Sequence, residues 1–181
     1  KNESFFYYMH SLDYQMFVVK RSGNKENVRF DKITERINKL LHKDEKNKLD
    51  AGVVAQKVIT SIFSGITTEE LDLESAKICA NMATVHPLYS NLAGRILVSN
   101  LHKKTKNTFV DKMIEINSET GRNGKKLLNE SWLEWVENNK KELDEMVDYN
   151  RDFQLDFFAF KTLERAYLIK NHHTNNIYER P

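Results

Sequence analysis

The stretch Met16–Leu41, MFVVKRSGNKENVRFDKITERINKLL, decides the fold of this chain. It begins with a short apolar run, Met16–Val19, made of residues that favour strands. A basic turn follows, in which we expect Gly23 and Asn24 to supply the positive φ that a tight reversal needs. Glu26–Phe30 then alternates polar and apolar residues, as a half-buried strand does. The first half of the stretch therefore predicts a hairpin of two short strands.

The second half of the stretch predicts a helix. Asp31 is expected to cap it by accepting a hydrogen bond from a free backbone N–H group. Apolar side chains then recur on one face of the helix, at Ile33, Ile37, Leu40 and Leu41. The predicted order is thus strand, basic turn, strand and capped helix.

Three further helices are predicted before residue 108. Ala51–Phe63 has apolar residues at helical spacing, and Gly65 is placed to end that helix in the left-handed conformation. Thr67 and Glu70 have the spacing of a capping box, which begins the next helix. Leu88–Leu101 follows a proline and forms the last helix. The fold class is therefore mainly α, a four-helix bundle under a small β hairpin or sheet.

The remaining residues predict the start of a second, mainly helical unit. A short helix is expected from Phe109, and Gly121–Gly124 is the clearest loop. Ser131 is expected to cap one helix that runs to Met146. An aromatic-rich segment at 148–160 indicates core or interface, and 167–179 has the pattern of a hairpin.

We expect three parts in the chain. These are an extension at 1–15, a first domain at 16–108, and a partial helical domain at 109–181. Because the chain begins at Lys1 and stops abruptly at Pro181, it is expected to be a piece of a longer protein. Met16 is then a plausible true start.

Composition restricts the class of protein. The chain has 181 residues, 40% hydrophobic and 30% charged, which is ordinary for a folded helical protein. A net charge of +2 is too small to indicate nucleic-acid binding. Its single cysteine, Cys79, excludes an internal disulfide and a four-cysteine zinc site, and it favours a reducing, cytoplasmic setting. No apolar run is long enough to span a membrane, and residues 1–15 lack the apolar core of a signal peptide.

Two places have the chemistry of an anion site. Lys20 and Arg21 lie at a strand end beside the Gly23 turn, where two cations and free backbone N–H groups suit a polyphosphate. Asp72, at a helix start, is a short acid of the kind that accepts hydrogen bonds from ribose hydroxyls. From the residues alone the simpler interpretations are favoured, namely solvated surface charge for the basic pair and helix-dipole stabilisation for Asp72.

Other polar groups indicate no chemistry. His172 and His173 are adjacent and would point to opposite faces of a strand, and no acidic or cysteine partner has the spacing of a metal ligand. Cys79 lies in a helix of small residues and is expected to be a core residue. We therefore predict no metal site built from side chains of this chain.

Three runs nevertheless resemble one family. They are VVKRSGNKENVRFDKITERI (18–37), SGITTEELD (64–72) and HPLYSNLAGRILVSNLHKKTK (86–106). Met16–Thr108 resembles an ATP-cone, the regulatory domain at the amino end of the large subunit of class I ribonucleotide reductase. NRDFQLDFFAFKTLERAYLIK (150–170) and ERP (179–181) are similar to the segment that leads into the catalytic part of that subunit.

The resemblance implies a fold, an effector and a set of site residues. The fold is a four-helix bundle capped by a small sheet. The effector is ATP as activator or dATP as inhibitor, with Mg²⁺ as a possible companion. By motif position, the implied ATP/dATP site consists of Lys20, Arg21, Glu26, Asn27, Val28, Arg29, Phe30, Asp31, Lys32, Thr68, Asp72 and Lys103.

Roles follow from the same motif positions. Lys20, Arg21 and Lys103 match nucleotide- and phosphate-contacting cations, and residues 26–32 match the segment that wraps the base and phosphates. Thr68 matches a nucleotide-contacting threonine, and Asp72 matches the acid that helps to tell ATP from dATP. The implied partners are the radical-generating small subunit and further copies of the large subunit. No catalytic residue is expected in this chain, since the family's reactive cysteines lie beyond Pro181.

Two other interpretations remain open. The chain could carry the ATP-cone of an anaerobic reductase or of a nucleotide-dependent repressor. One cysteine cannot build the repressors' zinc ribbon, and residues 150–170 argue against both. It could also be a degenerate ATP-cone that binds no nucleotide and serves only as an interaction module. Departures from the family pattern, such as Ser22 in place of an acid and Ala51-Gly52 in place of an acid-proline pair, remove none of the implied ligands.

Overall fold

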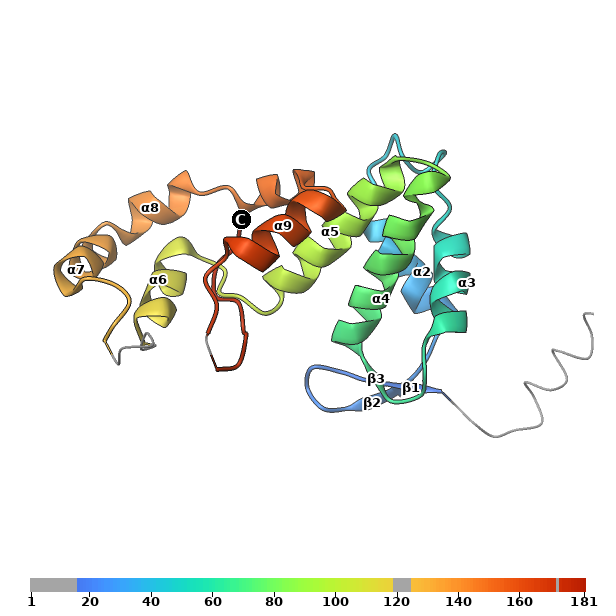
Figure 1. Cartoon of the computed structure of the whole chain (residues 1–181), viewed down its shortest axis with the longest axis horizontal. Coiled ribbons are helices and arrows are strands. Elements are labelled where there is room, and N and C mark those ends of the chain that lie inside the picture. The colour runs from blue at the N-terminus through green and yellow to red at the C-terminus, as the bar shows by residue number, and fades with distance from the viewer. Residues whose placement is uncertain (1–15, 119–124, 172) are drawn as a thin grey trace, which may run out of the picture.

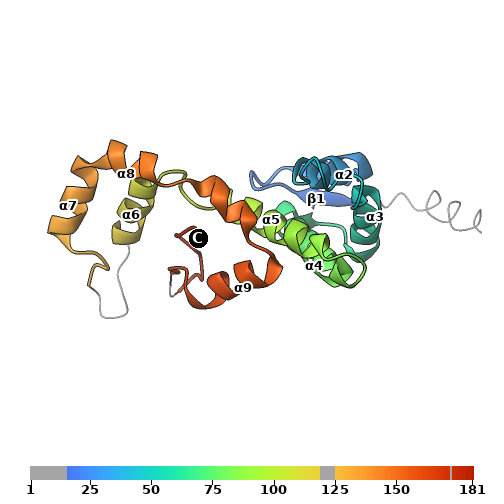
Figure 2. The same cartoon turned by 90° about the horizontal axis from the view of Figure 1, so that it is seen from above.

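The computed structural model describes residues 16–118, 125–171 and 173–181. Helices dominate, and they form two groups at opposite ends of an elongated molecule (Figure 1). The first group contains α2 (Phe30–Lys39), α3 (Ala51–Ser61) and α4 (Thr68–Asn81). The second contains α6 (Phe109–Ser118), α7 (Glu130–Asn138) and α8 (Lys140–Met146). Between the two groups lie α5 (Leu88–His102) and α9 (Phe157–Ala166), as the view from above also shows (Figure 2).

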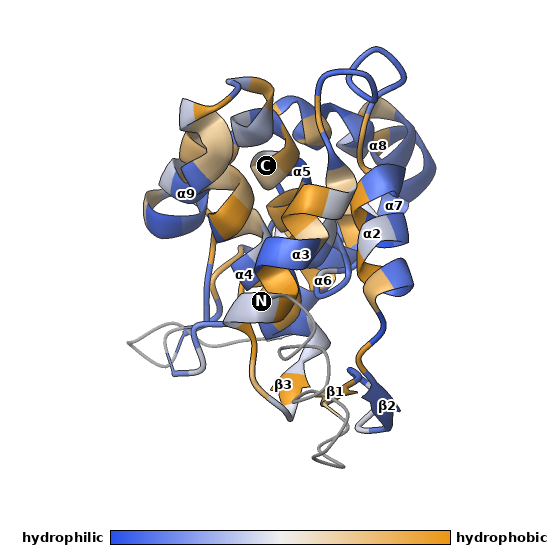
Figure 3. Ribbon diagram, turned by 90° about the vertical axis from the view of Figure 1, so that its right-hand side faces the viewer, coloured by the Kyte–Doolittle hydropathy of each residue, from blue (hydrophilic) through white to orange (hydrophobic). Residues whose placement is uncertain are grey.

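A three-stranded sheet covers one end of the first group. Strands β1 (Phe17–Val19) and β2 (Lys25–Asn27) pair antiparallel, so the predicted hairpin is confirmed. A third strand, β3 (Ile66–Thr67), runs parallel to β1 on its other side and was not predicted. The two strands β1 and β3 are hydrophobic, whereas β2 is hydrophilic (Figure 3). The mainly α fold with a small β cap is thus the fold observed.

The turn of the hairpin differs in one detail from its prediction. Gly23 has a φ of +82°, as expected, but Asn24 has no positive φ. Two backbone hydrogen bonds close the turn, from Gly23 N to Lys20 O and from Lys20 N to Asn24 O, each 2.8 Å long. One left-handed residue is enough to reverse the chain between them.

Two predicted helix ends are wrong. Helix α2 begins at Phe30, so Asp31 is already inside its first turn and provides no cap; its carboxylate accepts from the Arg29 guanidinium, with Nε 3.0 Å away. Gly65 has a φ of +89° but does not end α3, because that helix already stops at Ser61. Gly65 instead donates its N–H to Phe17 O at 2.7 Å, which directs the chain into β3.

The start of α4 agrees with its prediction. The Thr67 hydroxyl accepts from Glu70 N at 3.1 Å, and the Glu70 carboxylate accepts from Thr67 N at 2.9 Å. This is the predicted capping box. The hydrogen bonds from Thr67 lower the pKa of Glu70, the backbone N–H being the larger cause.

The main core lies where α2, α3, α4 and α5 meet. Residues such as Ile37, Val54 and Leu92 are fully or almost fully buried there. Cys79 belongs to the same core, as predicted, and burial raises the pKa of its thiol to about 12. Phe160 of α9 is also part of this core, so the downstream segment helps to cover α5.

Helix α5 is the centre of the packing. It contacts α4 on one side, and on the other side it contacts α9 and the 3-10 helix η2 (Tyr149–Gln154). Gly94 allows this second contact. A Cβ built on Gly94 would lie 2.1 Å from Leu155 O and 2.6 Å from the carbonyl carbon of Asp156. Only a residue without a side chain permits this approach.

The second group of helices has a small core of its own. Val110, Met113, Ile116 and Val136 are its buried members. The predicted cap at Ser131 is wrong, because Asn129 caps α7 by accepting from Ser131 N at 2.9 Å. The single helix expected from Ser131 to Met146 is broken at Asn139 into α7 and α8. The predicted loop at 121–124 lies outside the described residues.

The end of the chain forms a reduced version of the expected hairpin. Lys170 and Ile177 form one isolated antiparallel bridge, and Tyr178 N donates to Ile169 O at 3.0 Å. In the part of the chain that the structure describes, no helix is long and apolar enough to cross a membrane.

Candidate functional site

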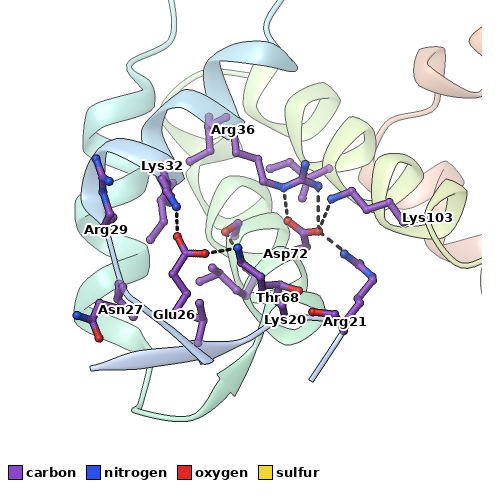
Figure 4. Close-up of a pocket in the computed structure, with 18 residues that line it drawn as sticks. Lys20, Arg21, Glu26, Asn27, Arg29, Lys32, Arg36, Thr68, Asp72 and Lys103 are labelled. Carbon is purple, nitrogen blue, oxygen red and sulfur yellow. Dashed lines mark hydrogen bonds and ion pairs between the residues drawn. The ribbon is translucent and has the colours of Figure 1, made fainter. Parts of the chain in front are cut away.

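A cavity of about 460 Å³ is lined by residues of the sheet and of helices α2, α4 and α5 (Figure 4). The structure brings ten of the twelve predicted site residues to its wall. They are Lys20, Arg21, Glu26, Asn27, Val28, Arg29, Lys32, Thr68, Asp72 and Lys103. These residues are up to 83 positions apart in sequence, so the fold and not a local motif assembles them.

Phe30 and Asp31 do not line the cavity. Phe30, at the start of α2, is 48% exposed. The Asp31 carboxylate is exposed and forms an ion pair with Arg29, which lowers the pKa of Asp31. In this structure Asp31 therefore restrains Arg29 at the rim of the cavity.

The sheet carries one charged group of the cavity. Glu26, on β2, forms ion pairs with Lys20 at the end of β1 and with Lys32 on α2 (Figure 4). The side chains of both lysines are about half exposed, at 49% and 51%. Glu26 thus pairs with two cations of the cavity wall that remain about half exposed to solvent.

Asp72, on α4, is the centre of a second charged group and is only 4% exposed. Arg36 of α2 donates to both of its carboxylate oxygens, from Nε at 2.5 Å and from Nη2 at 2.9 Å. Lys103, at the end of α5, lies 3.2 Å from Oδ2, and Arg21 Nη2 lies 3.8 Å from the same oxygen. One buried acid is therefore surrounded by three cations from three different segments.

Lys103 and Arg21 are held from α5 as well. Lys103 follows the last residue of α5, where the helix dipole favours a cation. Its partial burial lowers its pKa, against the opposing effect of Asp72. Arg21 Nη2 donates to Asn100 Oδ1 at 2.5 Å. The basic turn of the hairpin is thus anchored to the same helix that carries Lys103.

Residue-by-residue reading of the sequence missed part of the wall. Five apolar side chains complete it, namely Val18, Ile33, Ile37, Leu71 and Ile96. Arg36 was also missed, although it lies four residues after Lys32 and so shares a face of α2 with it. That spacing is a signal that could have identified Arg36. The ion pair with Asp72 could not have been read from the sequence, because the two residues lie on different helices.

The balance of charge and apolar surface defines what the cavity can do. Among the residues that the structure describes, its wall carries five cations besides Arg29 and two carboxylates, Glu26 and Asp72. Apolar side chains on the same wall offer a surface to a flat, weakly polar group. This combination suits a ligand with a multiply charged anionic end and an aromatic end. Among the described residues, no group of three or more His, Cys, Asp or Glu side chains could hold a metal ion.

Comparison with known proteins gives two results. The model of the ATP cone domain family matches residues 16–104. The chain is also 46% identical over 171 residues to ribonucleoside-diphosphate reductase large chain 2 of Saccharomyces cerevisiae, which covers 92% of the chain and 19% of that relative.

Large subunits from distant organisms give similar values. The ribonucleoside-diphosphate reductase large subunit of Vaccinia virus is 46% identical over 169 residues, which is 92% of the chain and 22% of the relative. That of Caenorhabditis elegans is 44% identical over 169 residues, 91% of the chain and 21% of the relative. The chain spans about a fifth of the length of the curated relatives it matches. With an ATP cone domain at residues 16–104, it belongs to the family of ribonucleoside-diphosphate reductase large subunits.

Proposed function

We propose that this chain is the nucleotide-sensing part of a ribonucleoside-diphosphate reductase large subunit, and that its cavity binds ATP as activator or dATP as inhibitor. The observation that carries the proposal is the convergence of cations from the hairpin, α2 and α5 on one cavity with an apolar wall. A nucleoside triphosphate has the matching chemistry, since its phosphates are strongly anionic and its base is flat and aromatic.

Each part of the ligand has a candidate partner. Lys20, Arg21, Lys32 and Lys103 are positioned to bind phosphates, because charge-assisted hydrogen bonds from Lys and Arg suit phosphate oxygens. Ile33 and Ile96 belong to the apolar wall that would hold the adenine base. The Asp72 carboxylate would accept a hydrogen bond from the ribose. Mg²⁺ would arrive with the triphosphate.

ATP and dATP differ only in the ribose 2′-hydroxyl, so any preference must come from a group that senses this hydroxyl. A hydrogen bond to a charged group contributes about 1.5–3 kcal/mol, which is enough for a useful preference. Asp72 is the buried acid on the cavity wall and is therefore our candidate for this discrimination. Allosteric control would then require the two nucleotides to stabilise different arrangements of the whole enzyme.

The wider role follows from the family. The whole enzyme would reduce ribonucleotides to deoxyribonucleotides with a radical-generating small subunit, and its large subunits would associate with one another. We propose residues 16–108 as the regulatory domain and residues 109–181 as the beginning of the helical region ahead of the catalytic part. This chain would supply regulation and no catalytic residue.

A second candidate function is an interaction module that binds no nucleotide. One observation favours it: Lys20 and Lys32 already pair with Glu26, and Arg21, Arg36 and Lys103 already surround Asp72. If these internal ion pairs are stronger than the contacts with a triphosphate, the cavity stays closed to it. The degenerate ATP cone is therefore a real competitor.

Calorimetric titration of the chain with ATP and with dATP separates the two candidates. We expect saturable binding of both nucleotides with one site per chain. The Asp72→Asn variant should bind both but with a changed ratio of affinities. Circular dichroism confirms that each protein is folded. Absence of binding to a folded wild-type chain would refute the regulatory function and leave the interaction module.

A further inference from the structure

Arg36 and Asp72 form a two-pronged ion pair whose carboxylate lies on the cavity wall, whereas the two-pronged pair of Arg29 uses Asp31, which does not line the cavity. The guanidinium donates from Nε to Oδ1 at 2.5 Å and from Nη2 to Oδ2 at 2.9 Å. In the close-up, Arg36 reaches down from α2 onto the carboxylate with both prongs (Figure 4). A bidentate pair of this kind fixes the plane of a carboxylate as well as its position.

The other two cations near Asp72 make looser contacts. Lys103 and Arg21 approach only Oδ2, at 3.2 Å and 3.8 Å, and they come from the end of α5 and from the hairpin, whereas Arg36 comes from α2 (Figure 4). A single contact to one oxygen leaves the carboxylate free to rotate. These cations can therefore turn toward a phosphate group without changing the orientation of Asp72, provided that Arg36 stays in place.

Arg36 is also tied to α5. Its Nη2 lies 3.5 Å from Ser99 Oγ, so this side chain from α2 contacts α4 through Asp72 and α5 through Ser99. Its side chain is 33% exposed, and that of Asp72 is 6% exposed. The partner is thus well buried, and the cation that aligns it is held from a second helix.

We propose that Arg36 is a positioning residue that acts through Asp72 and sets the preference of the site between a ribonucleotide and a deoxyribonucleotide. This inference rests on the proposed function. In this proposal Lys103 and Arg21 bind the phosphates, whereas Arg36 keeps the Asp72 carboxylate oriented toward the ribose. Arg36 contributes to selectivity because a misaligned carboxylate accepts equally poorly from both sugars.

The test is a double-mutant cycle on the full chain, with ATP and dATP titrated separately by calorimetry. The proteins are the wild type, Arg36→Lys, Asp72→Asn and the double variant. Lysine keeps the charge but cannot form the two-pronged contact. We expect Arg36→Lys to move the ratio of the two dissociation constants toward one by about threefold to tenfold. In the Asp72→Asn background the same substitution should leave the ratio unchanged.

Two further variants keep the test decisive. Arg29→Lys is the matched control, since Arg29 also lines the cavity from the start of α2 but pairs with Asp31; it should change both affinities by the same factor. Ser99→Ala removes the hydroxyl that holds Nη2, and it should shift the ratio in the same direction as Arg36→Lys by a smaller factor. Ser99→Ala also provides the answer if Arg36→Lys does not fold, which thermal unfolding monitors.

The outcomes separate this inference from the proposed function. If the wild type binds neither nucleotide, the proposed function fails. If the wild type discriminates but Arg36→Lys changes both affinities by one factor, only the role of Arg36 is overturned. Independent effects of the Arg36 and Asp72 substitutions on the ratio would likewise overturn it. Wild-type binding without any preference would overturn both the role of Asp72 and that of Arg36.

Discussion

Two clusters of polar and charged residues meet at the C-terminal end of α5: the cavity cluster and a second cluster on the downstream side. The adjacent residues His102 and Lys103 belong to different clusters. Lys103 faces the cavity, whereas His102 Nε2 lies 2.7 Å from Asp152 Oδ2 on the downstream side. This second group, which we call the hinge cluster, consists of His102, Lys112, Tyr149, Asp152 and Arg180. Side chains of the cavity cations are a third to a half exposed, but Lys112 and Arg180 are only 1% and 8% exposed as whole residues.

The partners of the cations also differ. In the hinge cluster, Arg180 donates to Thr105 Oγ1 at 2.7 Å and to the carbonyl oxygens of His102 and Thr105 at 3.0 Å and 3.1 Å. Lys112 Nζ lies 3.6 Å from the centre of the Tyr149 ring. Because these partners are neutral and the two cations are buried, the cations are not available to an anionic ligand. In the cavity the partners are the carboxylates of Glu26 and Asp72, and the cations themselves stay partly exposed, so a phosphate can reach a cation and withdraw it.

The comparison shows that lysine and arginine can either stabilise the fold or remain available to a ligand, and that their burial and the type of their partner decide which. The hinge cluster joins α5 to η2, to α6 and to the end of the chain, so it stabilises the fold. The cavity cluster is the part that can exchange partners. Substitutions on the hinge side should therefore change stability and not nucleotide affinity, and substitutions on the cavity side should do the reverse.

The largest expected effect is that of Gly94→Ala, which separates α5 from the segment that covers it. Backbone atoms at 2.1 Å and 2.6 Å cannot give way as a flexible side chain would, so we expect a loss of about 3 kcal/mol in the free energy of unfolding. Urea unfolding measures it. Gly52→Ala is the control, since only the Asp50 carboxylate oxygen lies within 4 Å of the added Cβ, at 3.1 Å. A loss below 1 kcal/mol for Gly94→Ala would contradict the packing described.

Arg180→Ala should have the next largest effect, about 2 kcal/mol of stability, because it leaves buried carbonyl groups without a donor. Nucleotide affinity of the folded fraction should stay unchanged. Urea unfolding and calorimetry together check both statements. Arg180→Lys keeps the charge and should recover part of the loss. A fall in nucleotide affinity with unchanged stability would show that Arg180 acts on nucleotide binding, contrary to its assignment to the hinge cluster.

Lys103→Gln tests the cavity side and should give the opposite pattern. We expect about tenfold weaker binding of ATP and dATP, because one charge-assisted contact to phosphate is lost. Stability should change by less than about 1 kcal/mol, since the ion pair with Asp72 is partly solvated. Lys104→Gln is the control, because Lys104 pairs with Glu69 and does not line the cavity. Equal effects of the two substitutions would argue against a specific phosphate contact.

The smallest expected effect is a pH dependence that comes from Lys112. Burial, with a smaller contribution from Arg180, lowers the pKa of Lys112 to about 8, from 10.5. Between these two values the unfolded chain binds more protons than the folded one, so stability rises with pH. Relative to a Lys112→Met variant, the wild type should gain roughly 1–2 kcal/mol of unfolding free energy between pH 7.5 and 9.5.

Measuring this difference against the variant removes two opposing titrations. Burial raises the pKa of Cys79 and of Tyr149 to about 12 each, so both groups reduce stability at higher pH. Both groups are present in the variant. The contribution of Cys79, which belongs to the main core, cancels in the comparison, and that of Tyr149, which contacts Lys112, is small below pH 9.5 because the ordinary pKa of a tyrosine is 10.0. A difference between wild type and variant that stays constant from pH 7.5 to 9.5 would show that Lys112 is not desolvated.

Local signals made the first half of the molecule predictable. The hairpin and the helix that begins at Thr67 have their causes within a few residues, in strand propensity and in a capping box. Predictions failed where a non-local contact decided the structure. Strand β3 has two residues, and it exists because it pairs with β1 from 48 positions away. Asp31 does not cap α2, because its carboxylate forms an ion pair with Arg29 instead.

The candidate site divides in the same way. Ten of its residues were predicted from the resemblance to a family. Such a resemblance identifies which residues come together in the folded protein, but it does not give the physical reason why they do. Arg36 was overlooked because its importance lies in a pair with Asp72 across two helices, and no spacing within one segment encodes that pair. Sequence patterns thus reveal which side chains share a face, whereas partner choice between elements requires the structure.

The close approach at Gly94 has a consequence for how separable the regulatory part is. The backbone at Leu155–Asp156 lies against α5 where a side chain would otherwise stand, and Phe160 fills the core beside it. A segment cut out at residue 104 would therefore carry an uncovered strip along its central helix. The ATP cone of this chain therefore shares part of its packing with residues some sixty positions further on, and we expect the isolated segment 16–104 to be less stable than the same segment within the full chain.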